Sequence, residues 1–431
     1  MLLEGQGINA LNHLTIGGCD SLELCEKYGT PLYVIDENVV REHCRLYKKS
    51  IDEFYNGNGL VFFASKALCN LEMIRVVNSE GLGADSVSAG ELYTVLKAGM
   101  DSEKICIHGN NKTDEELEYA IKNRVGRIVI DDVSEIKKVD KIAKANNIRQ
   151  KVLFRIKPGI DAHTHEFIMT GQIDCKFGFA LETGEAEEAI CKALEYDNII
   201  VAGVHCHIGS QIFESEPFKE AAKVLVNFMA DIKDKTGYEM FELNLGGGFG
   251  VTYTEKDDPI KFNKYIEEVS AIIKEECAKR NLVLPFVMME PGRSIVGTAG
   301  VTLYKAGAIK DIPGIRCYVS VDGGMTDNPR YILYQAEYTA LVANKAGDEK
   351  TEVVTLAGKC CESGDLLGEN MPIQKVESGD IIAVLTTGAY NYSMASNYNR
   401  VPRPAMVMVK NGESRVIVKR ETFEDLVRND I

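Results

Sequence analysis

The sequence Val61-Phe62-Phe63-Ala64-Ser65-Lys66-Ala67-Leu68 is a short apolar run that ends at a single lysine. A polar stretch, Cys69–Glu72, follows directly and is typical of the start of a helix. A lysine that closes a buried strand either extends to solvent or lies in a pocket, where apolar surroundings favour its neutral, nucleophilic form. The lysine alone does not distinguish these alternatives, and the ends of the later strands are needed to decide between them.

From this stretch onward, strand-like and helix-like segments alternate. Apolar runs lie at residues 60–64, 82–85, 105–108, 127–131, 151–156, 200–206, 241–245 and 286–290. Helix-like segments separate them, for example Ala89–Leu96, Thr113–Lys122, Val133–Ala145, Pro217–Lys233 and Pro259–Arg280. The number of these units is the one that a closed (β/α)8 barrel requires, although a doubly wound open sheet would also alternate. We therefore predict an α/β fold with a TIM-type (β/α)8 barrel.

The pattern changes after Ser294, where strand-like runs follow one another without long helical periodicity. These runs are Val301–Ala308, Cys317–Val321, Thr351–Leu356, Asp380–Leu385, Met406–Val409 and Ser414–Lys419. Short strands separated by turns are typical of a β-rich barrel or sandwich.

The first residues of the chain contain one further strand candidate, Pro31–Ile35, and a helix is expected from Glu37 to about Phe54. We therefore predict three segments. Residues 1–36 contribute one or more strands to the β-rich domain, residues 37–294 form the barrel, and residues 295–431 form the β-rich domain.

Composition limits the classes of function. The chain has 431 residues, of which 45% are hydrophobic and 26% charged, as in an ordinary globular protein. Its net charge of −15 argues against nucleic acid or an anionic membrane as a partner. The 12 cysteines are scattered, the first residues do not resemble a signal peptide, and no apolar run approaches the roughly 18 residues of a membrane span. These features predict a cytoplasmic protein with reduced thiols.

Reactive or glycine-rich residues stand at the ends of nearly all the predicted barrel strands. In chain order they are Lys66, Asp85, His108, Asp131, Arg155, His207, Gly246–Gly250, and Glu290 with Arg293. The active site of a (β/α)8 barrel lies at the carboxyl ends of its strands. The series therefore predicts an active site there.

The seventh strand leads from Leu243 into a glycine run, Gly246–Gly250, that is interrupted only by Phe249. Glycines let backbone N–H groups approach a phosphate closely, and phosphate sites in barrels lie after strands seven and eight. The alternative is a tight turn between strand and helix. The run matches neither a Walker loop nor a GxGxxG fingerprint.

The sixth strand ends in His205-Cys206-His207, followed by Ser210. Strand alternation places the two histidines on one face and Cys206 on the other, so the three residues do not readily share a metal, and we expect none. A planar cofactor stacked on one imidazole, with its phosphate near Ser210, agrees better with the pattern. The alternative is a hydrogen-bonded pair of interior histidines.

The eighth strand ends at Glu290, followed by Arg293. A carboxylate that emerges from an apolar strand must be paired or protonated. Opposite the pyridine nitrogen of pyridoxal phosphate, Glu290 would keep that nitrogen protonated. The alternative is a buried ion pair between Glu290 and Arg293.

The β-rich segment contributes a second group of candidate residues, in Asn328–Tyr334, Cys360–Asp365 and Thr387–Tyr390. The adjacent residues Cys360 and Cys361 are not expected to form a disulfide. A thiol beside acidic groups is expected to stay protonated, which suits a proton donor better than a nucleophile. A buried structural cysteine is the alternative.

Together, these motifs resemble those of the fold-type III pyridoxal-phosphate-dependent decarboxylases, in particular the diaminopimelate decarboxylase family. The resemblance covers residues 29–404, nearly the whole chain. It is carried by Phe63–Ala67, Ala84–Glu91, Thr164-His165 with Lys176–Gly178, His205–Gln211, Gly246–Gly250, Glu290–Ser294, Cys361–Asp365 and Thr387–Tyr390. The segment around Cys361 and Glu362 favours the diaminopimelate branch.

The resemblance implies a role for each matching residue. Lys66 would hold pyridoxal 5'-phosphate as a Schiff base, His207 would stack on its ring, and Glu290 would pair with its nitrogen. The implied cofactor-binding set also includes Asp85, Ser210, Gly248, Pro291, Gly292, Arg293 and Tyr390. The implied substrate-binding set is Arg293, Arg330, Tyr334, Glu362 and Tyr390, with Cys361 as the proton donor.

The reaction implied is the last step of lysine biosynthesis, decarboxylation of meso-2,6-diaminopimelate at its D-centre to L-lysine. The resemblance also implies a homodimer with shared active sites. One departure is Lys359, where the family often has proline, which bears on the rigidity of the cysteine loop. The alternatives are a sister decarboxylase of ornithine, arginine, lysine or carboxynorspermidine, an alanine racemase, and a non-catalytic pyridoxal-phosphate carrier.

Overall fold

A computed structural model describes residues 1–160 and 175–431. The motif residues Thr164 and His165 therefore lie outside the described residues. The chain forms two compact units. The barrel unit comprises residues 43–250 and 259–292, and the β unit comprises residues 1–42, 251–258 and 293–431.

The barrel unit is a closed ring of parallel strands, as predicted. In spatial order the ring is β5 (Gly59–Ala64), β6 (Gly83–Ser86), β7 (Ile105–Ile107), β8 (Arg127–Ile130), β9 (Gln150–Lys157), β11 (Ile199–His205), β12 (Glu242–Asn244) and β13 (Phe286–Met289). Pairing of β13 with β5, and of β8 with β9, closes it. The short strand β10 (Phe179–Ala180) pairs with β9 outside the ring.

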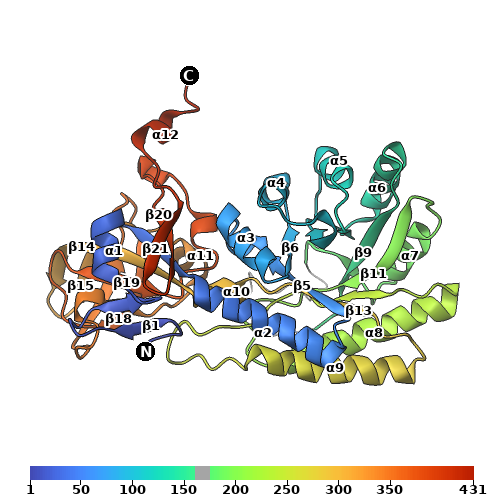
Figure 1. The fold of residues 1–431 in the computed structure, drawn as a ribbon, viewed down its shortest axis with the longest axis horizontal. Coiled ribbons are helices and arrows are strands. Elements are labelled where there is room, and N and C mark those ends of the chain that lie inside the picture. Colours follow the sequence, from blue (N-terminus) through green and yellow to red (C-terminus); the bar gives the residue numbers. More distant parts are fainter. Residues whose placement is uncertain (161–174) are drawn as a thin grey trace. The chain divides into compact units, whose positions relative to one another are not determined.

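Helices follow the strands and surround them (Figure 1). They are α3 (Leu71–Ser79), α4 (Ala89–Lys97), α5 (Asp114–Lys122), α6 (Val133–Ala145), α7 (Glu185–Ala193), α8 (Glu216–Thr236) and α9 (Phe262–Lys279), preceded by α2 (Glu37–Tyr55). Short polar residues cap several of them, for example Asn70 at α3, Ser88 at α4 and Thr113 at α5. Each cap lies a few residues after a strand end, which keeps those strand-to-helix loops short.

Apolar side chains from alternate positions of the strands fill the inside of the barrel. Phe62, Cys106, Val129, Leu153, Ala202 and Met288 form one buried cluster. This filled interior leaves the carboxyl ends of the strands as the place for chemistry.

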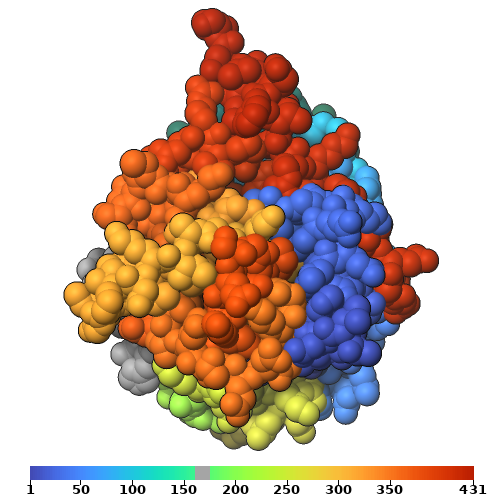
Figure 2. All heavy atoms as spheres, turned by 90° about the vertical axis from the view of Figure 1, so that its left-hand side faces the viewer, coloured from blue at the N-terminus to red at the C-terminus, as the bar shows by residue number. Residues whose placement is uncertain are grey.

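The β unit contains a sheet in which β18 (Leu366–Ile373), β17 (Glu352–Ala357), β15 (Arg316–Val321), β14 (Gly300–Ile312), β4 (Leu32–Asp36), β20 (Ala405–Lys410) and β21 (Glu413–Val418) are neighbours in that order. Strand β19 (Ile381–Leu385) pairs with β14 and with β16 (Ala340–Val342). The N-terminal strand β4 pairs with β14 on one side and with β20 on the other. Figure 2 shows the N-terminal residues in blue against this C-terminal part of the chain.

Smaller elements complete the β unit. These are β1 (Gln6–Ile8), β2 (Leu14–Ile16), β3 (Cys19–Asp20), α1 (Ser21–Tyr28), α10 (Arg293–Val296), α11 (Arg330–Tyr334) and α12 (Phe423–Val427). Across residues 1–160 and 175–431, no helix has the length and apolar character that a membrane crossing requires.

Candidate active site

The loops that follow β11, β12 and β13 pack against one another through their backbones. The Glu290 N–H donates to the Gly246 carbonyl at 2.8 Å, and the Ile212 N–H donates to the Gly248 carbonyl at 3.0 Å. A side chain at Gly246 would collide with the Cys206 carbonyl, so this approach requires glycine. The glycine run is therefore explained in part by loop packing, and this packing places the three predicted motifs side by side.

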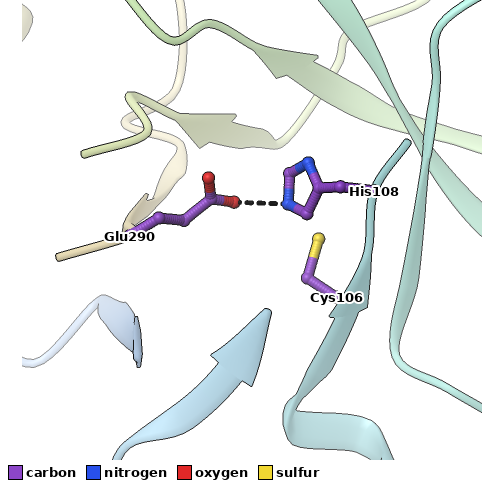
Figure 3. Close-up of side chains that lie close together, drawn as sticks. All are labelled: Cys106, His108 and Glu290. Atoms are coloured by element: carbon purple, nitrogen blue, oxygen red, sulfur yellow. Dashed lines mark hydrogen bonds and ion pairs between the residues drawn. The ribbon is translucent and has the colours of Figure 1, made fainter. Parts of the chain in front are cut away.

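Glu290 lies at the centre of this group, 7% exposed, and accepts three hydrogen bonds. Its Oε1 accepts from His108 Nε2 at 2.8 Å and from Asn244 Nδ2 at 2.6 Å, and its Oε2 accepts from His205 Nε2 at 3.1 Å. Figure 3 shows the first of these bonds. Burial disfavours the ionised form, but the two histidines outweigh burial and hold the pKa of Glu290 well below its usual value. Glu290 is therefore an ionised carboxylate.

The two histidines are fixed in one tautomer by this carboxylate. An ionised carboxylate only accepts hydrogen bonds, so His108 and His205 each carry a proton on Nε2. Burial lowers the pKa of His205 to about 4, because its desolvation outweighs the attraction of Glu290. His205 is therefore neutral near pH 7. Its Nδ1 is buried and accepts no hydrogen bond from the described residues.

His207 lies two residues beyond the end of β11 and is half-buried. Its Nδ1 accepts a hydrogen bond from the Gly247 N–H at 3.3 Å, which fixes the ring against the glycine run. Burial, followed by the nearby charge of Lys66, lowers the pKa of His207 well below its usual value. The ring is therefore neutral and is held on the loop that Gly246–Gly250 form.

Lys66 lies in the short 3-10 turn Ser65–Ala67 that follows β5, and its side chain is exposed. The Ser65 hydroxyl donates to the Asp85 carbonyl at 2.6 Å and ties this turn to β6. The Asp85 carboxyl is buried, and its pKa is raised well above the usual value by desolvation and by Glu290, with Lys66 opposing the shift. Asp85 Oδ1 has no hydrogen-bond partner in the described part of the chain. Lys66 thus acts electrostatically on both Asp85 and His207.

Pro291 and Gly292 join this group to β5. The Pro291 carbonyl accepts a hydrogen bond from the Ala64 N–H at 3.0 Å. A side chain at Gly292 would press against Ala64 and Ala67. Ser210, half-buried in the loop after β11, completes the predicted set within the barrel unit.

Cys106, His108 and Glu290 offer ligand atoms that lie within 4.8 Å of one another (Figure 3). Burial and the charge of Glu290 raise the pKa of the Cys106 thiol well above its usual value. Thiols bind metals as thiolates, so the group as it stands offers a protonated thiol and a histidine that already donates to Glu290. Cys206 of the His-Cys-His motif is also buried, and burial raises its pKa to about 12.

The β unit contains a second group of predicted residues around two buried arginines. Arg330 Nη1 donates to the Tyr253 hydroxyl at 3.0 Å and to the Tyr338 hydroxyl at 2.8 Å. Arg293 Nη1 also donates to the Tyr253 hydroxyl. Tyr253 and Tyr338 were not predicted, because an isolated tyrosine outside a strand end or motif gives no recognisable signal in the sequence.

The two predicted tyrosines lie beside these arginines. The Arg293 guanidinium carbon lies 4.8 Å from the ring centre of Tyr390, and that of Arg330 lies 6.0 Å from the ring centre of Tyr334. Tyr390 has a φ of 62°, in the left-handed region that non-glycine residues rarely adopt. Such backbone conformations cluster at functional sites.

The cysteine segment is held by hydrogen bonds to its backbone. The Cys361 N–H donates to Asn399 Oδ1 at 2.8 Å, and the Cys360 N–H donates to the buried Asp365 carboxylate at 2.7 Å. The side chains of Cys361 and Glu362 are exposed. Burial, followed by the charge of Asp365, raises the pKa of Cys360 to about 11. The loop is therefore fixed at its backbone and presents Cys361 and Glu362 outward.

Comparison with known proteins agrees with this geometry. Residues 37–297 match the family model described as pyridoxal-dependent decarboxylase, pyridoxal binding domain. The chain is 50% identical over 414 residues to the diaminopimelate decarboxylase of Bacillus methanolicus, covering 96% of each chain. It is 48% identical over 426 residues to that of Bacillus subtilis, covering 98% of this chain and 96% of the relative.

The fold is also similar to that of solved structures. A diaminopimelate decarboxylase from M. jannaschii, solved in complex with L-lysine, superposes with a TM-score of 0.91 at 36% sequence identity. The match covers 100% of this chain and 99% of that chain. From this full-length similarity, the chain belongs to the diaminopimelate decarboxylase family of pyridoxal-dependent decarboxylases.

Proposed function

We propose that this protein decarboxylates meso-2,6-diaminopimelate at its D-centre to L-lysine and carbon dioxide, with pyridoxal 5'-phosphate as cofactor. The observation that carries the proposal is the ionised Glu290, buried at the end of β13 and oriented by His108, His205 and Asn244. The full-length similarity to proteins named diaminopimelate decarboxylase supports the choice of substrate.

The residues of the barrel unit fit this cofactor. A carboxylate has about four acceptor positions, and three of those on Glu290 are used, so one on Oε2 remains for an N–H donor. Asp85 Oδ1 is a buried polar atom without a hydrogen-bond partner in the described residues, as expected where a polar ligand binds. The neutral ring of His207 offers a flat surface for stacking.

When bound, pyridoxal phosphate withdraws electrons from the substrate carbon that loses the carboxylate. We assign to Glu290 the hydrogen bond that keeps the pyridine nitrogen protonated, and to His207 the stacking contact. Lys66 would hold the cofactor covalently through its side-chain amine. The remaining proposed cofactor contacts are Asp85, Ser210, Gly248, Pro291, Gly292, Arg293 and Tyr390.

For the substrate, we assign the retained carboxylate to Arg293 and Arg330, because two guanidinium groups can bind a carboxylate through several charged hydrogen bonds. Glu362 forms an ion pair with the distal ammonium group of the substrate. Tyr334 and Tyr390 form the other contacts to the substrate. Cys361 returns a proton to the carbon from which carbon dioxide has left.

At the level of the whole chain, residues 37–294 are proposed to bind the cofactor. Residues 295–431 contribute substrate and dimer contacts, and residues 1–36 join them through a strand. The antiparallel pairing of β4 with β14 supports this last assignment. We further propose a homodimer with shared active sites and a cytoplasmic location, on the basis of the family resemblance and the scattered cysteines.

Product analysis tests the substrate. The cofactor-loaded protein is given equal amounts of meso-diaminopimelate, ornithine, arginine, lysine and carboxynorspermidine. We expect diaminopimelate alone to disappear and lysine to accumulate. A diamine or polyamine product would instead indicate a sister decarboxylase, and no product at all, with the Schiff base present, would favour a non-catalytic cofactor carrier.

Borohydride reduction tests the cofactor contact. Reduction should fix the cofactor to Lys66, and mass spectrometry should find the label on the peptide that contains it. Lys66→Ala should lose the label, whereas Lys112→Arg, at a lysine that is buried in an ion pair, should keep it. A label on a different lysine would contradict the assignment.

A further inference from the structure

The Tyr253 hydroxyl contacts both buried arginines of the β unit. Arg293 Nη1 and Arg330 Nη1 both donate to its hydroxyl oxygen, the second at 3.0 Å. The three side chains are 6–8% exposed, so these bonds are shielded from water. Within residues 1–160 and 175–431, Arg330 forms no ion pair with a carboxylate, and its polar partners are the hydroxyls of Tyr253 and Tyr338.

Two guanidinium groups held at one point repel each other and lose their hydration. The shared acceptor oxygen of Tyr253 offsets part of this repulsion and lost hydration. Burial alone would raise the pKa of the Tyr253 hydroxyl, but the charges and hydrogen bonds of Arg293 and Arg330 outweigh burial and lower it. The Tyr253 oxygen accepts a hydrogen bond from each arginine and so occupies the position of an acceptor shared by two cations.

The position of Tyr253 is itself fixed by its neighbours. Its N–H donates to Asp257 Oδ2 at 2.9 Å, and its carbonyl accepts from the Thr339 hydroxyl at 2.9 Å. Its ring packs edge-on against Tyr338, with the ring centres 5.3 Å apart. A rigidly held oxygen can fix the two more flexible side chains that bind to it.

Tyr338 is a second tyrosine that binds the same guanidinium nitrogen of Arg330. Its hydroxyl accepts from Arg330 Nη1 at 2.8 Å and pairs with the side-chain amide of the buried Asn391 at 3.3 Å. Arg330 therefore donates to two tyrosine oxygens, and it shares the Tyr253 oxygen with Arg293.

We propose that Tyr253 is a positioning residue for substrate recognition, whose hydroxyl holds Arg293 and Arg330 together so that they bind one carboxylate as a pair. This inference rests on the proposed function, in which the two arginines bind the retained carboxylate of the substrate. It adds a residue that does not itself bind the substrate.

Tyr253→Phe tests the proposal, because it removes the hydroxyl and keeps the ring. A charged hydrogen bond is lost from each arginine, so we expect the KM for meso-diaminopimelate to rise about tenfold or more. The Kd for L-lysine, measured by calorimetry on the cofactor-loaded protein, should rise by a similar factor. The kcat should change by less than about threefold, and the cofactor absorbance should be unchanged, since a positioning role for binding does not alter chemistry.

Tyr28→Phe is the matched control. It also removes a tyrosine hydroxyl bond within the β unit, to Ser414, but contacts neither arginine. Its KM and Kd should remain those of the unmodified protein. An unchanged Kd for L-lysine in a folded Tyr253→Phe variant would overturn the proposal.

Arg330→Gln separates this inference from the proposed function. If Arg330→Gln leaves the KM unchanged, the proposed substrate role of the arginines fails. If Arg330→Gln raises the KM and Tyr253→Phe does not, only the positioning role fails. If Tyr253 acts through Arg330, the double variant should raise the KM by less than the product of the two single effects. Should Tyr253→Phe not fold, the single and double variants Arg293→Gln and Arg330→Gln ask whether the two arginines bind one carboxylate as a pair, and effects on the Kd for L-lysine that combine independently would overturn the proposal.

Discussion

His108 Nε2 lies 2.8 Å from Glu290 Oε1, and both side chains are buried at the carboxyl ends of barrel strands (Figure 3). The histidine follows β7 and the glutamate follows β13, far apart in the sequence. Because a charge-assisted hydrogen bond orients the carboxylate, the position of Glu290 does not depend on a ligand. Preorganised charge of this kind is effective in catalysis, since it costs no reorganisation during the reaction.

Glu290→Gln should lower kcat by about 10²-fold or more, because an amide cannot keep a ring nitrogen protonated as a carboxylate does. It should also shift the absorbance of the bound cofactor. Steady-state kinetics and an absorbance spectrum measure both effects.

Glu242→Gln is the matched control for this variant. Glu242 is also a buried glutamate of the barrel, but it pairs with Arg127 at 2.7 and 2.9 Å at the amino ends of β12 and β8. This end of a barrel serves stability, so the variant should lower the melting temperature and keep kcat. If Glu290→Gln lowers kcat no more than Glu242→Gln does, Glu290 has no catalytic role.

Stability should fall as the pH is lowered through the range in which His205 titrates in the unfolded chain. Its pKa is about 4 when folded and about 6.5 when unfolded, so the unfolded state binds more protons between these values. The free energy of unfolding should therefore decrease between about pH 6.5 and 4, by at most about 3 kcal/mol from this residue.

His205→Gln isolates this contribution, because its amide nitrogen can still donate to Glu290 but does not titrate. Urea unfolding at several pH values should give a shallower pH dependence for the variant. Equal slopes for the two proteins would show that His205 is not buried in the neutral state.

The sequence predicted the barrel well because each strand–helix unit is marked by local patterns, namely a short apolar run followed by a helix cap and apolar residues at helical spacing. The predicted helix Val133–Ala145 coincides with α6, since Asp132 caps it and its apolar residues recur at helical spacing. Strand β18, Leu366–Ile373, was not predicted, because it contains Gly368, Asn370 and Pro372, which strands disfavour. Its pairing with β17 outweighs these local preferences.

In the barrel unit, a candidate residue could be predicted where its side chain stands at a strand end, whereas the candidates of the β unit were predicted from motifs outside the barrel strands. Glu290 and His207 follow that rule, because strand ends of a barrel converge whatever the intervening loops. Asn244 and Tyr253 were not predicted, because the predicted strand runs past Asn244 to residue 245, although β12 ends at Asn244, and because Tyr253 follows the glycine run. Asn244 contacts Glu290, and Tyr253 contacts the arginines. These contacts join residues that are distant in the sequence, so they cannot be read from the spacing of residues along the chain.

Lys112 and Glu135 should form a stability-determining pair. Lys112 Nζ lies 3.0 Å from Glu135 Oε1 and also donates to the Gly109 and Val129 carbonyls, and both residues are 3% exposed. Lys112→Met leaves a buried carboxylate unpaired and should lower the free energy of unfolding by about 3–5 kcal/mol.

The double variant Lys112→Met/Glu135→Gln removes that charge and should recover part of the loss, as measured by urea unfolding. Glutamine keeps an acceptor for the Asp131 N–H, which Glu135 now binds at 2.9 Å. A double variant less stable than Lys112→Met would show that the unpaired charge is not the cause.

Cys361→Ala should lower kcat by about 10²-fold or more while the cofactor absorbance stays the same, because the variant removes a proton donor and no cofactor contact.

Cys360→Ala is the matched control in the same loop. Cys360 is half-buried beside Asp365, whereas Cys361 is exposed. Since only an accessible thiol can reach the substrate carbon, Cys360→Ala should keep kcat within about threefold. An unchanged kcat in Cys361→Ala would remove the proton-donor role from Cys361, and an equal loss of kcat in both variants would assign the effect to the shape of the loop.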